Sequence, residues 1–254
     1  MPERFLEDKV ALVTAGSRNL GAAIAVALAE RGADVVVNYM TDGARAAALV
    51  DRLRQHGGDP HALQGDCGTV GGVEALVADA TALVGGRPIQ VLINNYGPFS
   101  KTRFAEMPED EFRRIFDANV TAAYTAVKAV VPGMRELGWG RVVNVSAGSA
   151  YLRNHSIYTL AKAALVTLTE TLAFELGPEI TVNCVTPGQI AESADDIAQF
   201  DPTFVDRAVA ATPIGRLATR PEVAAIVAEL CGPLFDAVSG VTIPIDGGWS
   251  LRGF

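Results

Sequence analysis

The feature that most constrains the fold is an alternation of short, β-branched apolar runs with longer stretches rich in alanine and leucine. The short runs predict strands at 10–14, 34–38, 91–93, 141–145, 181–185 and 242–245, with a weaker candidate at 61–64. The longer stretches predict helices at 20–31, 44–56, 73–84, 109–137, 156–176 and 222–230. Near-continuous apolar strands separated by helices are typical of a parallel sheet with helices on both faces. The sequence therefore predicts an α/β fold, doubly wound around one mostly parallel sheet.

We expect the whole chain, 1–254, to form one domain. It contains no low-complexity linker and no internal repeat, and the turn at 85–88 is too short to separate two domains. Ligands of such sheets bind beyond the carboxyl ends of the strands. The residues that follow each strand are therefore the candidates for function.

Composition and charge argue against several classes of protein. A formal net charge of -8 is unlike a nucleic-acid-binding protein, whose binding surface is basic. No apolar run reaches the ~18–20 residues of a membrane span, and the charged N-terminus does not resemble a signal peptide. The three cysteines, Cys67, Cys184 and Cys231, lack the spacing of a disulfide framework or a metal site. We expect free thiols in a reducing compartment, the cytoplasm, and no bound metal.

Tyr158 and Lys162 are four residues apart in a stretch expected to be helical, so their side chains share one face. A free tyrosine has a pKa of about 10, too high for ready proton exchange at neutral pH. A nearby ammonium favours the phenolate, so Lys162 is expected to lower the pKa of Tyr158. Such a pair can give a proton to a carbonyl oxygen or take one from an alcohol. The spacing alone is common, and an ordinary amphipathic helix is the alternative interpretation.

The loop after the first predicted strand is a candidate phosphate site, because the N–H groups and dipole of a helix N-terminus attract anions. Three glycines normally permit the tight turn, the approach of a diphosphate and the helix–sheet contact. Here only Gly21 is in its expected place, and Ala15 and Asn19 occupy the other two positions. Asn19 tolerates the left-handed conformation, whereas Ala15 is expected to leave the unusual angles to Gly16. A strand–helix turn without a ligand is the alternative.

Together, these motifs and several others resemble those of the short-chain dehydrogenase/reductase family over essentially the whole chain. The others are N-N-Y-G at 94–97, Asn119 in D-A-N-V, V-N-V-S at 143–146, N-C-V-T-P-G at 183–188 and D-G-G-W at 246–249. Each motif is modest, but their order and spacing are specific. The resemblance implies a single Rossmann-type domain with a mostly seven-stranded parallel sheet. It also implies an oxidoreductase of the ketoreductase type, similar to 3-oxoacyl thioester, polyketide and secondary-alcohol reductases.

The resemblance implies a role for three of these residues. Tyr158 would be the acid–base, and Lys162 would also hold the nicotinamide ribose. Asn119 would hold a water that relays protons to solvent.

The family's carbonyl-polarising serine has no clean counterpart in this chain. Ala147 occupies its usual position, and the loop from there to Tyr158 is two residues shorter than is common. Ser146 is the favoured substitute and Ser149 the other candidate. Because neighbouring strand residues face opposite sides, Ser146 and Ala147 cannot both face the site in a regular strand.

NADPH is the predicted cofactor. The end of the second strand, Asn38-Tyr39-Met40-Thr41, carries no acid to accept the ribose hydroxyls of NAD. Arg18 in the glycine loop is positioned to bind a 2′-phosphate, with a solvated loop cation as the alternative. By resemblance, Asp66 would contact the adenine. The complete predicted cofactor set is Ala15, Ser17, Arg18, Asn19, Leu20, Gly21, Asn38, Tyr39, Asp66, Asn94, Gly97, Tyr158, Lys162, Pro187, Gly188 and Ile190.

By the same resemblance, the segment 189–215 is expected to form a lid over the substrate. Tyr96 stands where the family usually has alanine, so it is expected to narrow the space near the cofactor or to pack against Phe99. The candidates for the substrate pocket are Tyr96, Phe99, Ser149, Tyr151, Asn154, His155 and Gln189.

Two other interpretations remain open at this point. The departures at Ala15, Asn19 and Ala147 would also suit a cofactor-binding scaffold with weak or no redox chemistry. Lyase or dehalogenase chemistry in the same fold is the other, against which the retained Lys162 argues. A small carbonyl or alcohol is the expected partner, with no nucleic acid and no membrane. The resemblance also implies a homotetramer, or a homodimer.

Overall fold

The computed structural model describes residues 3–100, 102–151, 156–199 and 201–251, and its centre is one seven-stranded sheet. The strand order is β3-β2-β1-β4-β5-β6-β7, and every neighbouring pair is parallel. The strands are β1 Val10–Val13, β2 Asp34–Tyr39, β3 His61–Gln64, β4 Val91–Asn94, β5 Gly140–Val145, β6 Ile180–Pro187 and β7 Thr242–Ile245. Every predicted strand is confirmed, including the weaker candidate at 61–64.

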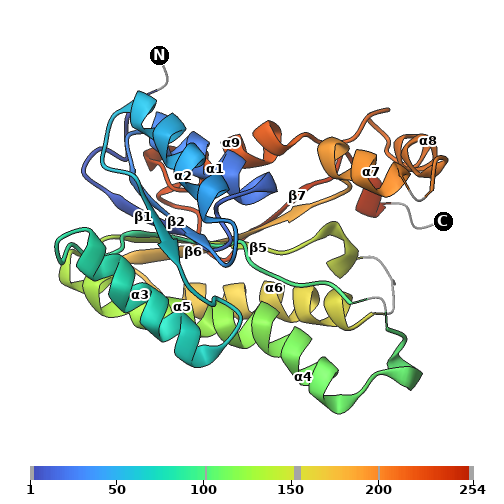
Figure 1. Ribbon diagram of the computed structural model, residues 1–254, viewed down its shortest axis with the longest axis horizontal. Coiled ribbons are helices and arrows are strands. Elements are labelled where there is room, and N and C mark those ends of the chain that lie inside the picture. The colour runs from blue at the N-terminus through green and yellow to red at the C-terminus, as the bar shows by residue number, and fades with distance from the viewer. Residues whose placement is uncertain (1–2, 101, 152–155, 200, 252–254) are drawn as a thin grey trace.

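Helices cover both faces of the sheet, as Figure 1 shows. One layer contains α1 Asn19–Glu30, α2 Gly43–Leu53 and α9 Arg220–Glu229. The opposite layer contains α3 Val70–Leu83, α4 Glu109–Phe116, α5 Ala122–Glu136 and α6 Ile157–Leu176. Each layer has its own apolar core, and alternate residues of β1 enter the two: Ala11 and Val13 the first, Val10 and Leu12 the second. This arrangement is the predicted doubly wound, Rossmann-type fold.

The helix predicted over 109–137 is interrupted. A π-helical turn, Asp117–Thr121, separates α4 from α5. Such turns are rare and occur frequently at functional sites. Asn119 lies within this one, so the interruption falls on a predicted catalytic residue.

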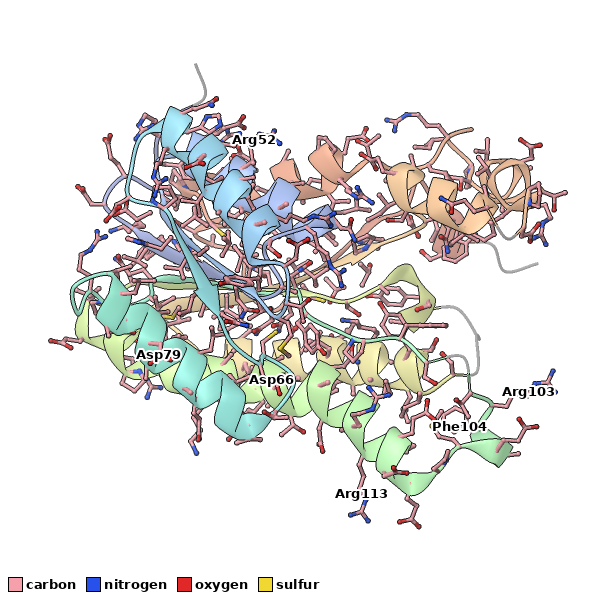
Figure 2. The ribbon with its side chains drawn as sticks, in the orientation of Figure 1. Arg52, Asp66, Asp79, Arg103, Phe104 and Arg113 are labelled. Atoms are coloured by element: carbon pink, nitrogen blue, oxygen red, sulfur yellow. The ribbon has the colours of Figure 1, made fainter. Side chains whose placement is uncertain are left out.

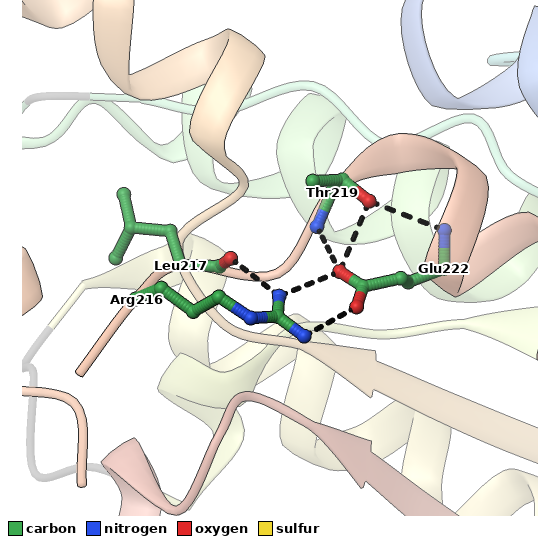
Figure 3. A network of polar contacts seen from close by, with 4 residues as sticks. All are labelled: Arg216, Leu217, Thr219 and Glu222. Atoms are coloured by element: carbon green, nitrogen blue, oxygen red, sulfur yellow. Dashed lines mark hydrogen bonds and ion pairs between the residues drawn. The ribbon is translucent and has the colours of Figure 1, made fainter. Parts of the chain in front are cut away.

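The predicted lid contains two short helices, α7 Ala191–Ala198 and α8 Phe204–Ala210. A bridge between Ile190 and Ala218 brings the two ends of this segment together. Just beyond it, the Glu222 carboxylate accepts hydrogen bonds from Thr219 at the start of α9 and from the Arg216 guanidinium (Figure 3). These contacts, that of Arg216 above all, lower the pKa of Glu222 to about 2. The two ends of the predicted lid segment therefore lie side by side and are held in place by hydrogen bonds.

Helix α6 is long and apolar enough to cross a membrane by length and composition, which the sequence reading did not anticipate. Here it packs against β6 and lies in the layer that covers the sheet. The three cysteines are free and buried, as expected.

Candidate active site

Two predicted catalytic side chains, those of Asn119 and Lys162, lie against Gly97, just after β4, and the Tyr158 ring lies beside Lys162. Lys162 Nζ donates a hydrogen bond to Val145 O at 2.9 Å and lies 5.6 Å from the centre of the Tyr158 ring. A Cβ atom added to Gly97 would lie 2.3 Å from Asn119 Oδ1 and 2.6 Å from Lys162 Nζ. Only glycine fits between these groups. The structure therefore brings the α6 pair and the asparagine of the π-helical turn to one point at the carboxyl edge of the sheet.

Asn119 is buried and half satisfied. Its Nδ2 donates to Pro98 O at 3.0 Å and to Ile115 O at 2.9 Å. Its Oδ1 has no hydrogen-bond partner in the described part of the chain. Buried polar atoms are rarely left unpaired, and ordered water commonly satisfies them. The orientation of Asn119 therefore fits a residue that holds a water beside Lys162.

Burial determines the protonation of the tyrosine–lysine pair. It raises the pKa of Tyr158 to about 12 and lowers the pKa of Lys162 to about 8. The net shift of the Tyr158 pKa is therefore upward, opposite to the expected lowering, because burial disfavours the charged phenolate. At neutral pH the phenol keeps its proton, which is the form that can act as an acid.

The two candidate serines have different surroundings. Ser146 is buried, and its Oγ donates to Lys162 O at 2.8 Å, so its proton is committed to the backbone of α6. Ser149 lies in the short 3₁₀ turn Gly148–Ala150 after β5, and its buried Oγ has no partner among the described residues. The favoured choice of Ser146 as the carbonyl donor is therefore not supported by its hydrogen bonding. Ser149 carries the free hydroxyl.

The glycine loop keeps its backbone shape without two of its glycines. Ala15 and Asn19 have φ angles of 48° and 49°, so both residues are left-handed. The prediction for Asn19 is confirmed, whereas the idea that Gly16 would relieve Ala15 is wrong. A Cβ atom on Gly21 would lie 2.4 Å from Ala15 O, so the remaining glycine permits the close contact between α1 and the loop.

Two asparagines, the buried Asn38 and the partly buried Asn95, anchor this loop from two sides. Asn38 Oδ1 accepts the Ala15 N–H at 3.0 Å, and Asn38 Nδ2 donates to Gly65 O at 2.9 Å. On the other side, Asn95 Nδ2 donates to Thr14 O at 3.0 Å. The Asn38 side chain therefore supports the glycine loop from within the protein. The sequence analysis had instead predicted that it contacts the cofactor.

Asn94, predicted to contact the cofactor, is also turned inward. Its Nδ2 donates to Asn144 Oδ1 at 2.9 Å, and the residue is buried. The neighbouring Asn95, which the sequence reading passed over, makes the loop contact instead. The two adjacent asparagines of N-N-Y-G could have indicated this difference. Successive side chains of a strand face opposite sides, so only one of the two asparagines can face the glycine loop.

A cavity of about 110 Å³ lies beyond the carboxyl ends of β1, β2 and β3. The residues lining it are Ala15, Ser17, Arg18, Asn38, Tyr39, Met40, Thr41, Asp42, Cys67 and Tyr96. Asp42 was not anticipated. It caps α2 by accepting the Arg45 N–H at 2.9 Å and lies 3.4 Å from Arg45 Nε, so its charge is already paired. Predicted Asp66, between β3 and α3 (Figure 2), accepts the Gly68 N–H at 2.8 Å and holds that turn.

Tyr96 lines this cavity. Its N–H donates to Thr14 Oγ1 at 3.0 Å, which turns the chain toward β1, and its ring lies against Gly68. Burial raises the pKa of Tyr96 and raises that of Cys67 to about 12. Phe99 instead packs edge-on against the Tyr158 ring, with centroids 5.3 Å apart. The alternative that Tyr96 packs on Phe99 is therefore not observed, and Tyr96 instead narrows the cavity beside the glycine loop. Its assignment to the substrate pocket stays a prediction.

The remaining predicted residues lie around the lid and after β5. Gly188 packs against Asp246, where a Cβ atom would lie 2.7 Å from the aspartate Cβ. Pro187 ends β6, Ile190 precedes α7, and Gln189 between them is partly buried. Tyr151 is half exposed and lies beside Thr242 of β7. Asn154 and His155 lie outside the described residues.

The arrangement fits a dinucleotide with its reactive end at Tyr158. The first-turn N–H groups of α1 have no intrahelical acceptor and face the glycine loop, as a diphosphate requires. Arg18 supplies a cation at the cavity, and Gly97 leaves space beside Lys162 and the unpaired oxygen of Asn119. No other residue type at Gly21 or Gly97 would leave that path open.

Comparison with known proteins agrees with this geometry. A family model described as enoyl-(acyl carrier protein) reductase matches residues 14–250. Versicolorin reductase 1 of Aspergillus parasiticus is 34% identical over 258 residues, covering 96% of this chain and 97% of that protein. The 3-oxoacyl-[acyl-carrier-protein] reductase FabG of Pseudomonas aeruginosa is 32% identical over 246 residues, covering 96% and 98%.

Solved structures are similar over almost the whole chain. A short-chain dehydrogenase/reductase from Serratia marcescens superposes with a TM-score of 0.88 at 33% identity, covering 97% of this chain and 99% of that one. The Pseudomonas aeruginosa RhlG/NADP active-site complex gives a TM-score of 0.88 at 30% identity, covering 98% and 100%. The chain therefore belongs to the short-chain dehydrogenase/reductase family of NAD(P)-dependent oxidoreductases.

Proposed function

We propose that this enzyme reduces a ketone to an alcohol with NADPH and that Tyr158 is the proton donor. The observation that carries the proposal is that Asn119 Oδ1 and Lys162 Nζ meet at Gly97, with the Tyr158 ring beside Lys162. Packing alone does not require a phenol, a buried ammonium and a half-satisfied amide at one point. The relatives named above include a versicolorin reductase and a 3-oxoacyl-[acyl-carrier-protein] reductase, which supports a carbonyl as the substrate class.

Tyr158, Lys162 and Asn119 each have a separate role in the proposed proton transfer. When bound, the reduced nicotinamide supplies the hydride for the carbonyl carbon. The Tyr158 hydroxyl gives its proton to the carbonyl oxygen, and the Lys162 ammonium stabilises the phenolate left behind. A water on Asn119 Oδ1 is positioned to return a proton from solvent. The same groups in the opposite protonation states serve alcohol oxidation.

The direct test is NADPH consumption with a panel of ketones and 3-oxoacyl thioesters, after a fluorescence titration with each cofactor. We expect NADPH to bind and at least one carbonyl to be reduced. Cofactor binding without turnover of any carbonyl would favour a cofactor-binding scaffold. Binding of neither cofactor would refute the proposal.

We expect the Ser149→Ala variant to lose about 10²–10³ in kcat/KM for the carbonyl, because one donor to the developing oxyanion is removed. Ser149 Oγ makes no protein hydrogen bond in the described chain, so the fold should not change. The Ser146→Ala variant loses its bond to Lys162 O and should lose stability, by about 1 kcal/mol, more than activity. Steady-state kinetics and thermal melts of both variants separate the two roles. A larger loss of activity in Ser146→Ala would reverse the assignment.

Cofactor choice is expected to depend on Arg18. In the Arg18→Gln variant the Kd for NADPH should rise about tenfold while that for NADH changes little, because only NADPH carries the 2′-phosphate. Asp42 does not oppose this, since its carboxylate is held by Arg45. Arg113→Gln, at an exposed site on α4 (Figure 2), is the matched control. Because solved neighbours include both an NADP and an NADH complex, equal losses for the two cofactors would remove the predicted preference.

The pH profile is expected to report Lys162. Its pKa of about 8 lies below that of Tyr158, about 12, so raising the pH first removes the ammonium while the phenol stays protonated. The kcat/KM for reduction should be level below pH 8 and decline above it, because the cation that stabilises the phenolate is lost. Melting temperatures at each pH control for unfolding. A profile that stays level well above pH 8 would contradict this role.

We also propose that the protein is a homotetramer or homodimer that works in the cytoplasm. Apolar side chains on the outer faces of α5 and α6 support association, namely Tyr124, Leu160 and Phe174, the last 92% exposed. Three buried free thiols are compatible with a reducing compartment.

A further inference from the structure

A second cavity, of about 480 Å³, lies between α1 and α9. Its volume falls within the range typical of small-molecule sites. Small apolar side chains form its floor, Ala23, Val26 and Ala27 from α1 and Ala224 and Ala225 from α9. None of Asn119, Tyr158 and Lys162 lines it, so it is not part of the active site.

Guanidinium groups at the edge of this cavity have hydrogen-bonding capacity that the protein does not use. Arg52, on α2, is on the same side of the sheet as α1 and α9 (Figure 2). Its side chain makes no hydrogen bond or ion pair with the described residues. Arg220 donates to Glu192 O and Ser193 Oγ, but its buried Nε has no acceptor in that same part of the chain. Arg52 is therefore the guanidinium at this cavity whose donors are free for a ligand oxygen, as far as the described residues go.

The acidic residues around the cavity leave one cation unpaired. Both carboxylate oxygens of Glu192 accept a hydrogen bond from the backbone N–H of Arg220. Arg31 forms an ion pair with Glu229, with 2.6 Å between Nη2 and Oε1. Glu30 adds one further carboxylate to the lining. Within the described part of the chain, none of the five N–H groups of the exposed Arg52 side chain has a protein acceptor, so Arg52 is the group most able to bind an anion.

We propose that the groove between α1 and α9 binds a small carboxylate with an apolar body, such as a short-chain fatty acid. The carboxylate pairs with Arg52, and the hydrocarbon lies on the alanine and valine floor. The groove also touches Asn19 of the glycine loop and Glu192 at the base of the lid, so its occupant contacts both elements that surround the active site.

The test is isothermal titration of the full-length protein, with NADPH present, using three probes. Hexanoate has both the charge and the apolar body, hexan-1-ol has only the body, and inorganic phosphate has only the charge. We expect hexanoate to bind at least about tenfold more tightly than either of the others. Phosphate binding as tightly as hexanoate would reduce the site to a simple anion site, and no hexanoate binding would overturn the proposal.

Variants separate this groove from the active site. Arg52→Gln should weaken hexanoate binding about tenfold, and Ala225→Phe should fill the groove and abolish it. Arg135→Gln on α5 and Ala48→Phe on α2 are the matched controls, since both positions are exposed and outside the groove. Ketone reduction should be unchanged in all four. Hexanoate binding that survives both groove variants would place the ligand elsewhere and refute the inference.

Discussion

Replacing Tyr158 by Phe is expected to lower kcat for ketone reduction by on the order of 10³ while leaving cofactor affinity nearly unchanged. A positioned proton donor contributes about 10²–10⁴ to a rate, and the Tyr158 hydroxyl is the group proposed to transfer its proton to the carbonyl oxygen. The ring itself should stay in place, because its contacts with Phe99 and Lys162 involve the aromatic faces and edges. Steady-state kinetics and a fluorescence titration with NADPH measure the two effects separately.

Tyr124→Phe is the matched control, because this residue is exposed on α5, away from Gly97. It should retain full activity. Unchanged turnover in Tyr158→Phe would remove the acid–base assignment. Activity absent from the wild-type protein as well, with NADPH still bound, would leave the scaffold interpretation.

Replacing Gly21 by Ala is expected to weaken the binding of both cofactors by about 100-fold or more. The added Cβ would lie 2.4 Å from Ala15 O and 2.8 Å from Asn95 Nδ2. The Ala15 oxygen is backbone in a left-handed turn and is held by Asn95, so it cannot move without opening the loop. A shift of the loop carries its N–H groups away from the diphosphate, and a 100-fold loss corresponds to about 2.7 kcal/mol.

Gly71→Ala is the control, because no atom lies within 4 Å of a Cβ at this position in α3. It should bind NADPH normally and be more stable by up to about 1 kcal/mol, the helix propensity difference between alanine and glycine. A Gly21→Ala variant that is folded by circular dichroism and binds NADPH with wild-type affinity would show that the dinucleotide does not lie on this loop.

The spacing of residues close together in the sequence was sufficient to predict the fold and part of the candidate active site. The strand and helix pattern predicted one mostly parallel sheet with helices on both faces, because near-continuous apolar strands are typical of strands buried on both sides. The four-residue spacing of Tyr158 and Lys162 placed both on one face of α6, because a helix has a period of about 3.6 residues. Asn19 was recognised as a left-handed residue because the side chain of asparagine tolerates that conformation.

Contacts between segments distant in the sequence determine the side-chain environments that the sequence pattern left open or predicted wrongly. The hydroxyl of Ser146 is bound to α6, which leaves Ser149 free, and no spacing rule records where a hydroxyl finds its acceptor. Asn38 and Asn94 turn inward to satisfy the polar groups of neighbouring strands. The π-helical turn at Asn119 has nearly the same apolar period as the helix it interrupts.

The sequence by itself determined the doubly wound sheet, the phosphate loop and the tyrosine–lysine face, because each depends on residues close together in the chain. The tertiary structure alone decided which hydroxyl is free, which cavity Tyr96 lines, and that the pKa of Tyr158 is raised and not lowered. Desolvation and hydrogen-bond pairing depend on which segments meet in space. These tertiary contacts depend on the packing of the whole chain and cannot be inferred from any single segment of the sequence.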